Sequence, residues 1–69
     1  MLMLTKDQIR QVRKALGMNT TEFAHELGVT VNAVARWEMG DRNPRRETME
    51  KLNHLAVKAR RAGLVLSVT

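Results

Sequence analysis

Apolar residues recur every three or four positions along most of the chain, which is the spacing of one face of an α-helix. The pattern is interrupted by glycines that predict helix ends: Gly17, Gly28, Gly40 and Gly63. The sequence therefore predicts four helices, over residues 6–16, 20–27, 31–39 and about 45–62.

Capping residues mark the starts of the first three predicted helices. Thr5 and Asn19 each have a Gln or Glu three residues later, which is the spacing of a capping box. Thr30 is a suitable N-cap for the third helix. Pro44 suits the first turn of the fourth helix. Within that helix Glu47 and Lys51, four residues apart, are expected to form a favourable ion pair.

The inward-facing positions of these helices predict the hydrophobic core. They share an apolar side chain at helical spacing: Ile9, Val12, Leu16, Phe23, Ala24, Leu27, Val34, Trp37, Met49, Leu52, Leu55, Ala56 and Ala59. The spacing of Trp37 from Val34 favours core packing over stacking on a nucleic acid. Met39, at the end of the third helix, is expected to be exposed.

The last six residues, 64–69, have a different pattern and predict a short β-strand. An unpaired strand of this composition would expose backbone groups and apolar side chains, so it needs a partner. Two partners remain open, the apolar segment 1–4 of the same chain and the same strand of a second subunit. The residues predicted for dimerisation are Leu64, Val65, Leu66, Val68 and, off the inner stripe of the fourth helix, Val57.

Length and composition limit the class of protein. A chain of 69 residues is too short for two cores, so we expect one domain over residues 1–69. It has no cysteine, which excludes disulfides and thiolate metal sites and suits a reducing cytoplasm. Neither a membrane span of about 20 apolar residues nor a signal peptide is apparent. The expected fold is all-α, a small four-helix bundle with a short C-terminal strand.

The net charge of +5 favours a polyanionic partner. The excess lies in residues 39–69, which carry seven basic and three acidic side chains. It begins directly after the third predicted helix.

Residues 20–39 have the layout of a helix-turn-helix unit. Ala24 is small where two short helices would cross, and Gly28 suits the turn between them. Val34 is placed to anchor the second helix in the core. In such a unit the second helix enters the DNA major groove.

Residues 9–56 resemble the phage-repressor (Cro/cI-like, or XRE) helix-turn-helix family. The resemblance rests on the core spacing and on the run W-E-x-G-x-R-x-P from Trp37 to Pro44. It implies a dimer that binds an operator and represses transcription, and it implies that Arg13 pairs with Glu38. Members often carry Gln or Arg at the first position of the third helix, where this chain has Val31. They often carry Gln at the first position of the second helix, where this chain has Thr20.

The outward face of the third helix predicts the base contacts: Val31, Asn32, Ala35 and Arg36. Arginine can bind guanine and asparagine can bind adenine through two hydrogen bonds, whereas the two apolar residues can contact thymine methyl groups. The predicted phosphate contacts surround that helix: Asn19, Thr20, Thr30, Arg42, Arg45 and Arg46. Arginines at a helix start oppose the helix dipole, and a phosphate backbone would favour them there.

No constellation of residues predicts catalysis, a cofactor, a small-molecule ligand or a metal site. His25 and His54 lack a third ligand at a useful spacing. The sequence therefore predicts a non-enzymatic, cytoplasmic, nucleoid-associated DNA-binding repressor from a bacterium, phage or plasmid. It would act as a homodimer on a palindromic double-stranded operator and could autoregulate its operon. Cro-like, controller, antitoxin and anti-CRISPR-associated roles stay open. The alternative is a protein-interaction module, such as an antitoxin that masks a toxin with its C-terminal tail.

Overall fold

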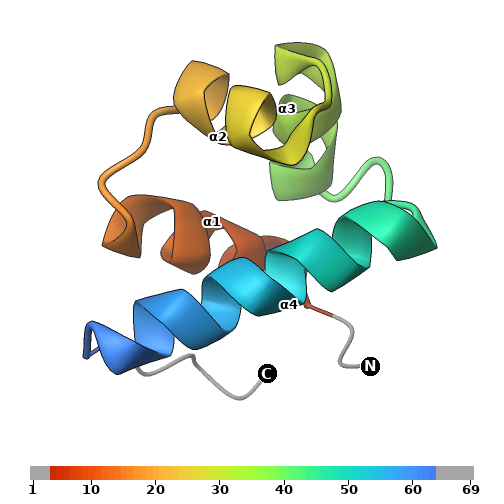
Figure 1. The fold of residues 1–69 in the computed structure, drawn as a ribbon. Helices are drawn as coiled ribbons and strands as arrows, with labels where there is room; N and C mark the ends of the chain where they lie inside the picture. Colours follow the sequence, from red (N-terminus) through yellow and green to blue (C-terminus); the bar gives the residue numbers. More distant parts are fainter. Residues whose placement is uncertain (1–3, 64–69) are drawn as a thin grey trace.

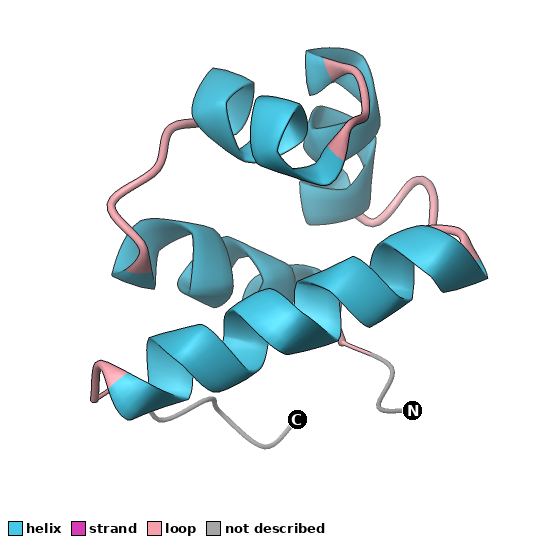
Figure 2. Ribbon diagram, in the orientation of Figure 1, coloured by secondary structure: helices cyan, strands magenta, loops and turns pink. Residues whose placement is uncertain are grey.

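The computed structural model describes residues 4–63 of the chain. This part contains four helices and no strand (Figures 1 and 2). The helices are α1 (Lys6–Ala15), α2 (Thr20–Leu27), α3 (Val31–Met39) and α4 (Arg46–Arg61). The predicted all-α architecture and four helices are confirmed for this part of the chain.

Local side-chain chemistry fixes the first three helix starts. Both predicted capping boxes are present. The Thr5 hydroxyl accepts from the Gln8 backbone amide at 3.2 Å, and the side-chain oxygen Oδ1 of Asn19 accepts from the Glu22 backbone amide at 2.8 Å. Thr30 caps α3 through a 3.1 Å hydrogen bond from the Ala33 amide. These hydrogen bonds satisfy backbone amides that a helix leaves without intrahelical partners.

The start of α4 differs slightly from the prediction. Arg45 is its N-cap rather than its first helical residue, and the Arg45 side chain makes no capping hydrogen bond. Met49 closes the first turn by donating to the Arg45 carbonyl at 2.8 Å.

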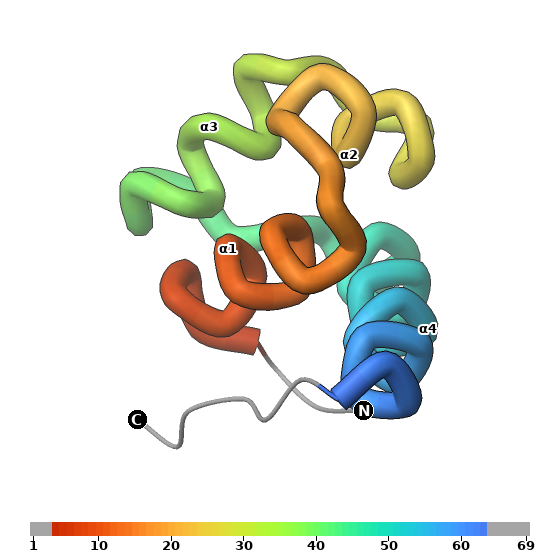
Figure 3. Tube along the Cα trace, turned by 90° about the vertical axis from the view of Figure 1, so that its left-hand side faces the viewer, coloured from red at the N-terminus to blue at the C-terminus, as the bar shows by residue number. Residues whose placement is uncertain are grey.

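The four helices enclose one core. The helix-turn-helix pair α2–α3 lies across α1 and α4, which run side by side below it (Figures 1 and 3). The core is formed by the buried apolar residues Leu4, Ile9, Val12, Phe23, Ala24, Leu27, Val34, Trp37, Met49, Leu52 and Ala56. Trp37 is only 4% exposed, so its predicted core position is confirmed, as is the exposure of Met39.

One predicted feature lies outside the described residues, and another prediction is wrong. The C-terminal strand over 64–69, with its dimerisation residues Leu64, Val65, Leu66 and Val68, lies outside the described residues. A favourable Glu47–Lys51 pair expected from their helical spacing is not formed, because the Lys51 ammonium donates to the Leu27 carbonyl at 3.4 Å instead. That acceptor lies on α2 and is brought to Lys51 only by the tertiary fold.

Candidate nucleic-acid interface

Helix α3 has one buried face and one exposed face. Val34, Trp37 and Glu38 point inward and are buried. Asn32 and Arg36, one helical turn apart, are both exposed on the opposite side.

The two apolar residues predicted to contact bases lie beside them. Val31 is 43% exposed at the start of α3, and Ala35 is half-buried one turn later. The structure therefore brings Val31, Asn32, Ala35 and Arg36 to the outward side of a single short helix. A helix with this arrangement can enter a major groove without disturbing the core behind it.

An ion pair fixes the orientation of α3 on α1. The Arg13 guanidinium donates to both carboxylate oxygens of Glu38, at 2.7 and 2.9 Å. Their side chains are only 14% and 7% exposed. Two parallel hydrogen bonds between planar groups define an orientation as well as a distance. The predicted pairing of Arg13 with Glu38 is confirmed.

Two further contacts extend this ion pair. Arg10 approaches Glu38 at 3.5 Å, and Arg13 donates to the Met18 carbonyl at 3.2 Å. The pair thus connects α1, α3 and the loop before α2. Its hydrogen bonds to Glu38 raise the pKa of Arg13, an effect that partial burial opposes.

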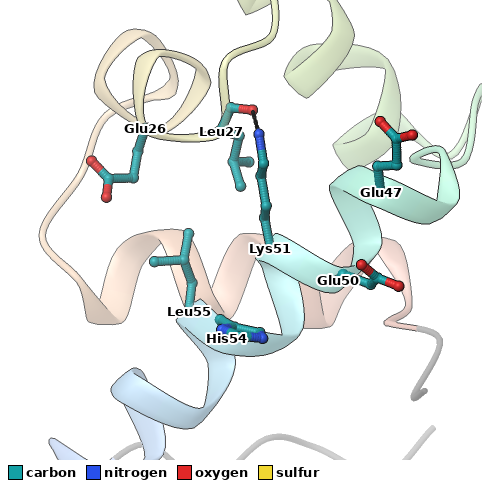
Figure 4. A pocket seen from close by; sticks show the side chains of 7 residues that line it. All are labelled: Glu26, Leu27, Glu47, Glu50, Lys51, His54 and Leu55. Atoms are coloured by element: carbon teal, nitrogen blue, oxygen red, sulfur yellow. Dashed lines mark hydrogen bonds between the residues drawn. The ribbon is translucent and has the colours of Figure 1, made fainter.

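The turn of the helix-turn-helix unit depends on Gly28. This residue has a φ of 70°, in the left-handed region that glycine adopts without steric cost. Lys51 lies close to it and binds the carbonyl of Leu27, so α4 holds the end of α2 (Figure 4). Sequence reasoning missed this role of Lys51, and no local sequence signal indicates it.

The N-terminus of α2 is exposed to solvent. Asn19 is exposed and Thr20 half-buried. The capping box uses the side-chain oxygen Oδ1 of Asn19, whereas the backbone amides of Thr20 and Thr21 have no hydrogen-bond partner in residues 4–63. Free amides at a helix start are suited to a phosphate.

The predicted arginines gather around the start of α4. Arg42 in the loop after α3, Arg45 and Arg46 are all exposed. No ion pair joins any of them to a carboxylate in the described part of the chain. Thr30 is likewise exposed, with its hydroxyl accepting the capping hydrogen bond of α3.

Val57, the predicted dimerisation residue within the described part of the chain, lies on α4 and is 49% exposed. His25 and His54 are exposed, and the described residues include no group of three side chains that could hold a metal ion. None of the four described helices is long and apolar enough to span a bilayer.

Comparison with known protein families gives one match. A model of the helix-turn-helix family matches residues 9–55, which include the whole of α2 and α3. Neither the curated proteins nor the solved structures gave a match.

Proposed function

Because the chain belongs to the XRE-type (Cro/cI-like) helix-turn-helix family, we propose that it is a dimeric, sequence-specific repressor that binds an inverted-repeat operator. The observation that carries the proposal is that α3 has two distinct faces. The inner face is buried and is held to α1 by the Arg13–Glu38 ion pair, whereas the outer face is exposed. Two such helices related by a two-fold axis would enter successive major grooves about one helical turn apart. Repression would follow from occlusion of the polymerase.

The proposed contacts divide into base readout and backbone positioning. Asn32 and Arg36 would bind base edges, with Val31 and Ala35 against thymine methyl groups. The free amides of α2 and the residues Asn19, Thr20 and Thr30 would position the domain on phosphates. The protein would act in the cytoplasm, without a cofactor or catalytic activity, and could autoregulate its own operon.

Selection of bound sequences from a random DNA pool tests this function. We expect enrichment of an inverted repeat whose half-sites are centred about 10 base pairs apart, because dimeric helix-turn-helix proteins place two helices at that spacing. A pool that stays unenriched at low salt would contradict the proposal. An enriched motif without two-fold symmetry would contradict the dimeric mode of binding alone.

The arginine cluster makes a separate prediction about salt. Replacing Arg42, Arg45 or Arg46 by alanine should each flatten the slope of log K against log[salt] by about one unit, since each lost phosphate contact retains one counterion. Arg60→Ala is the matched control, because it removes the same charge from a position about 21 Å further along α4 than Arg46. Unchanged slopes in all three variants would exclude these arginines as phosphate contacts.

The exposed Val57 supports one alternative, a protein-interaction module such as an antitoxin that masks a toxin through its C-terminal tail. A small toxin gene beside this one would favour that role. Specific DNA binding would then be secondary.

A further inference from the structure

The side of α4 that faces away from the core carries a continuous exposed stripe. Its members share one side of the helix and are all exposed: Glu47, Glu50, His54, Val57, Lys58 and Arg61. We call this stripe the outer face of α4. It lies opposite the buried stripe of Met49, Leu52, Ala56 and Ala59, so none of its side chains is needed for the core.

The outer face borders two shallow hollows that meet at His54. The first, of about 430 Å³, lies between α2 and α4 and includes three carboxylates, those of Glu26, Glu47 and Glu50 (Figure 4). The Lys51 ammonium group also lines it, where it donates to the Leu27 carbonyl. The second, of about 510 Å³, is lined by His54, Val57, Lys58 and Arg61. The first hollow thus has three carboxylates and one ammonium group, whereas the second has two basic side chains and no carboxylate.

The charges are arranged symmetrically about His54. Glu50 lies four residues before it and Lys58 four residues after it. Glu47 and Arg61 lie seven residues before and after it. A half-turn about an axis through His54 therefore places each acidic position opposite a basic one.

We propose that the outer face of α4 binds the outer face of α4 in a second copy of this chain, with the two helices antiparallel. This inference deepens the proposed dimeric repressor and rests on it. In a two-fold contact the same patch meets itself, so the patch must complement its own rotated image. The half-turn about His54 pairs Glu47 with Arg61 and Glu50 with Lys58 of the second copy, which meets that requirement, and it places Val57 opposite Lys51. A parallel arrangement would place like charges together.

The side chains of the outer face of α4 predict a contact made mainly of ion pairs around a small apolar centre. Lys58 and Arg61 of the second copy would enter the acidic hollow, where Glu26 of α2 adds a third carboxylate. Val57 and, opposite it, the aliphatic stem of Lys51 of the second copy supply the apolar area near the centre. Because these groups are exposed, the ion pairs are screened by salt, and the dimer should dissociate as salt concentration rises.

Charge reversal tests the proposal by sedimentation of the full chain without DNA. Glu47→Lys/Glu50→Lys makes the face wholly basic, and Lys58→Glu/Arg61→Glu makes it wholly acidic. Each variant alone should dimerise at least about tenfold more weakly than the unaltered protein, because every opposite-charge contact becomes a repulsion. An equimolar mixture of the two should associate, since a basic face then meets an acidic one.

Further variants keep the result interpretable. Lys14→Glu/Arg60→Glu changes the net charge equally at exposed positions off the outer face and should leave dimerisation unchanged. Exchanging all four charges at once should restore the homodimer, and circular dichroism reports folding of every variant. A protein that is monomeric throughout, or a mixture that does not associate, would overturn the proposal. So would a dimer that resists charge reversal but is lost on deleting residues 64–69, which would assign dimerisation to the tail. Because no DNA is present, each of these outcomes is independent of operator binding.

Discussion

Replacing Glu38 by alanine is expected to lower the free energy of unfolding by about 3 kcal/mol, because it leaves the Arg13 guanidinium without its carboxylate in a mostly buried site. Domains of this size have little stability to lose, so the variant should be largely unfolded at physiological temperature. Urea denaturation followed by circular dichroism measures the loss. Asp41→Ala, which removes an exposed carboxylate outside the ion pair, should change stability by less than about 0.5 kcal/mol.

A double-mutant cycle measures the coupling energy between Arg13 and Glu38 and separates it from the effect of changing the size of each side chain. Arg13→Met/Glu38→Leu replaces both partners by apolar residues and leaves no buried charge unpaired. It should be more stable than Glu38→Ala, since apolar replacement of a whole buried pair is often neutral or stabilising. Additive effects of the two single substitutions would show that Arg13 and Glu38 are not energetically coupled. That result would contradict the view that this ion pair fixes the orientation of α3 on α1.

The need to fix the orientation of α3 explains why a buried ion pair, Arg13–Glu38, occurs in so small a core. Apolar replacement of a whole buried ion pair is often neutral or stabilising, so net stability does not account for the pair. Its geometry restricts how α3 can rotate on α1. Apolar side chains such as Val34 and Trp37 hold the helix against the core without fixing that rotation as tightly. The rotation of α3 decides which side chains face outward, so orientation is the property that the interface requires.

Helix boundaries could be predicted from the sequence because their causes are local. A capping box involves residues only three positions apart, so Thr5 and Asn19 predicted the starts of α1 and α2. The start of α4 was displaced by one residue, to Arg46, because no side-chain cap marks it. The inward stripe of α4 likewise follows from periodicity alone.

Contacts between distant residues could not be predicted in the same way. Lys51 was assigned to Glu47 by helical spacing, but the fold brings the free carbonyl of Leu27 within its reach. The partners Arg13 and Glu38 were predicted only through the family resemblance, since no local rule links residues 25 positions apart. The symmetry of the outer face of α4 becomes evident only when the opposite, buried face is known.

The base-contacting residues should have the largest effect on sequence discrimination. Asn32→Ala and Arg36→Ala each remove a side chain that can make two hydrogen bonds to one base, worth about 1–3 kcal/mol of discrimination. Both residues are exposed on α3 and contribute nothing to the core, so the fold should remain intact.

Selection from a random DNA pool with each variant would measure this effect as loss of preference at one or two positions in each half-site, the symmetric positions changing together. Asn32→Ala and Arg36→Ala should relax different positions, because the two side chains lie one helical turn apart and would meet different base pairs. Arg60→Ala, which removes one exposed charge outside α3, should preserve the full motif. A uniform loss of affinity across all sequences would instead assign Asn32 and Arg36 to the phosphate backbone. Specificity would then have to arise from the shape and deformability of the DNA rather than from its base edges.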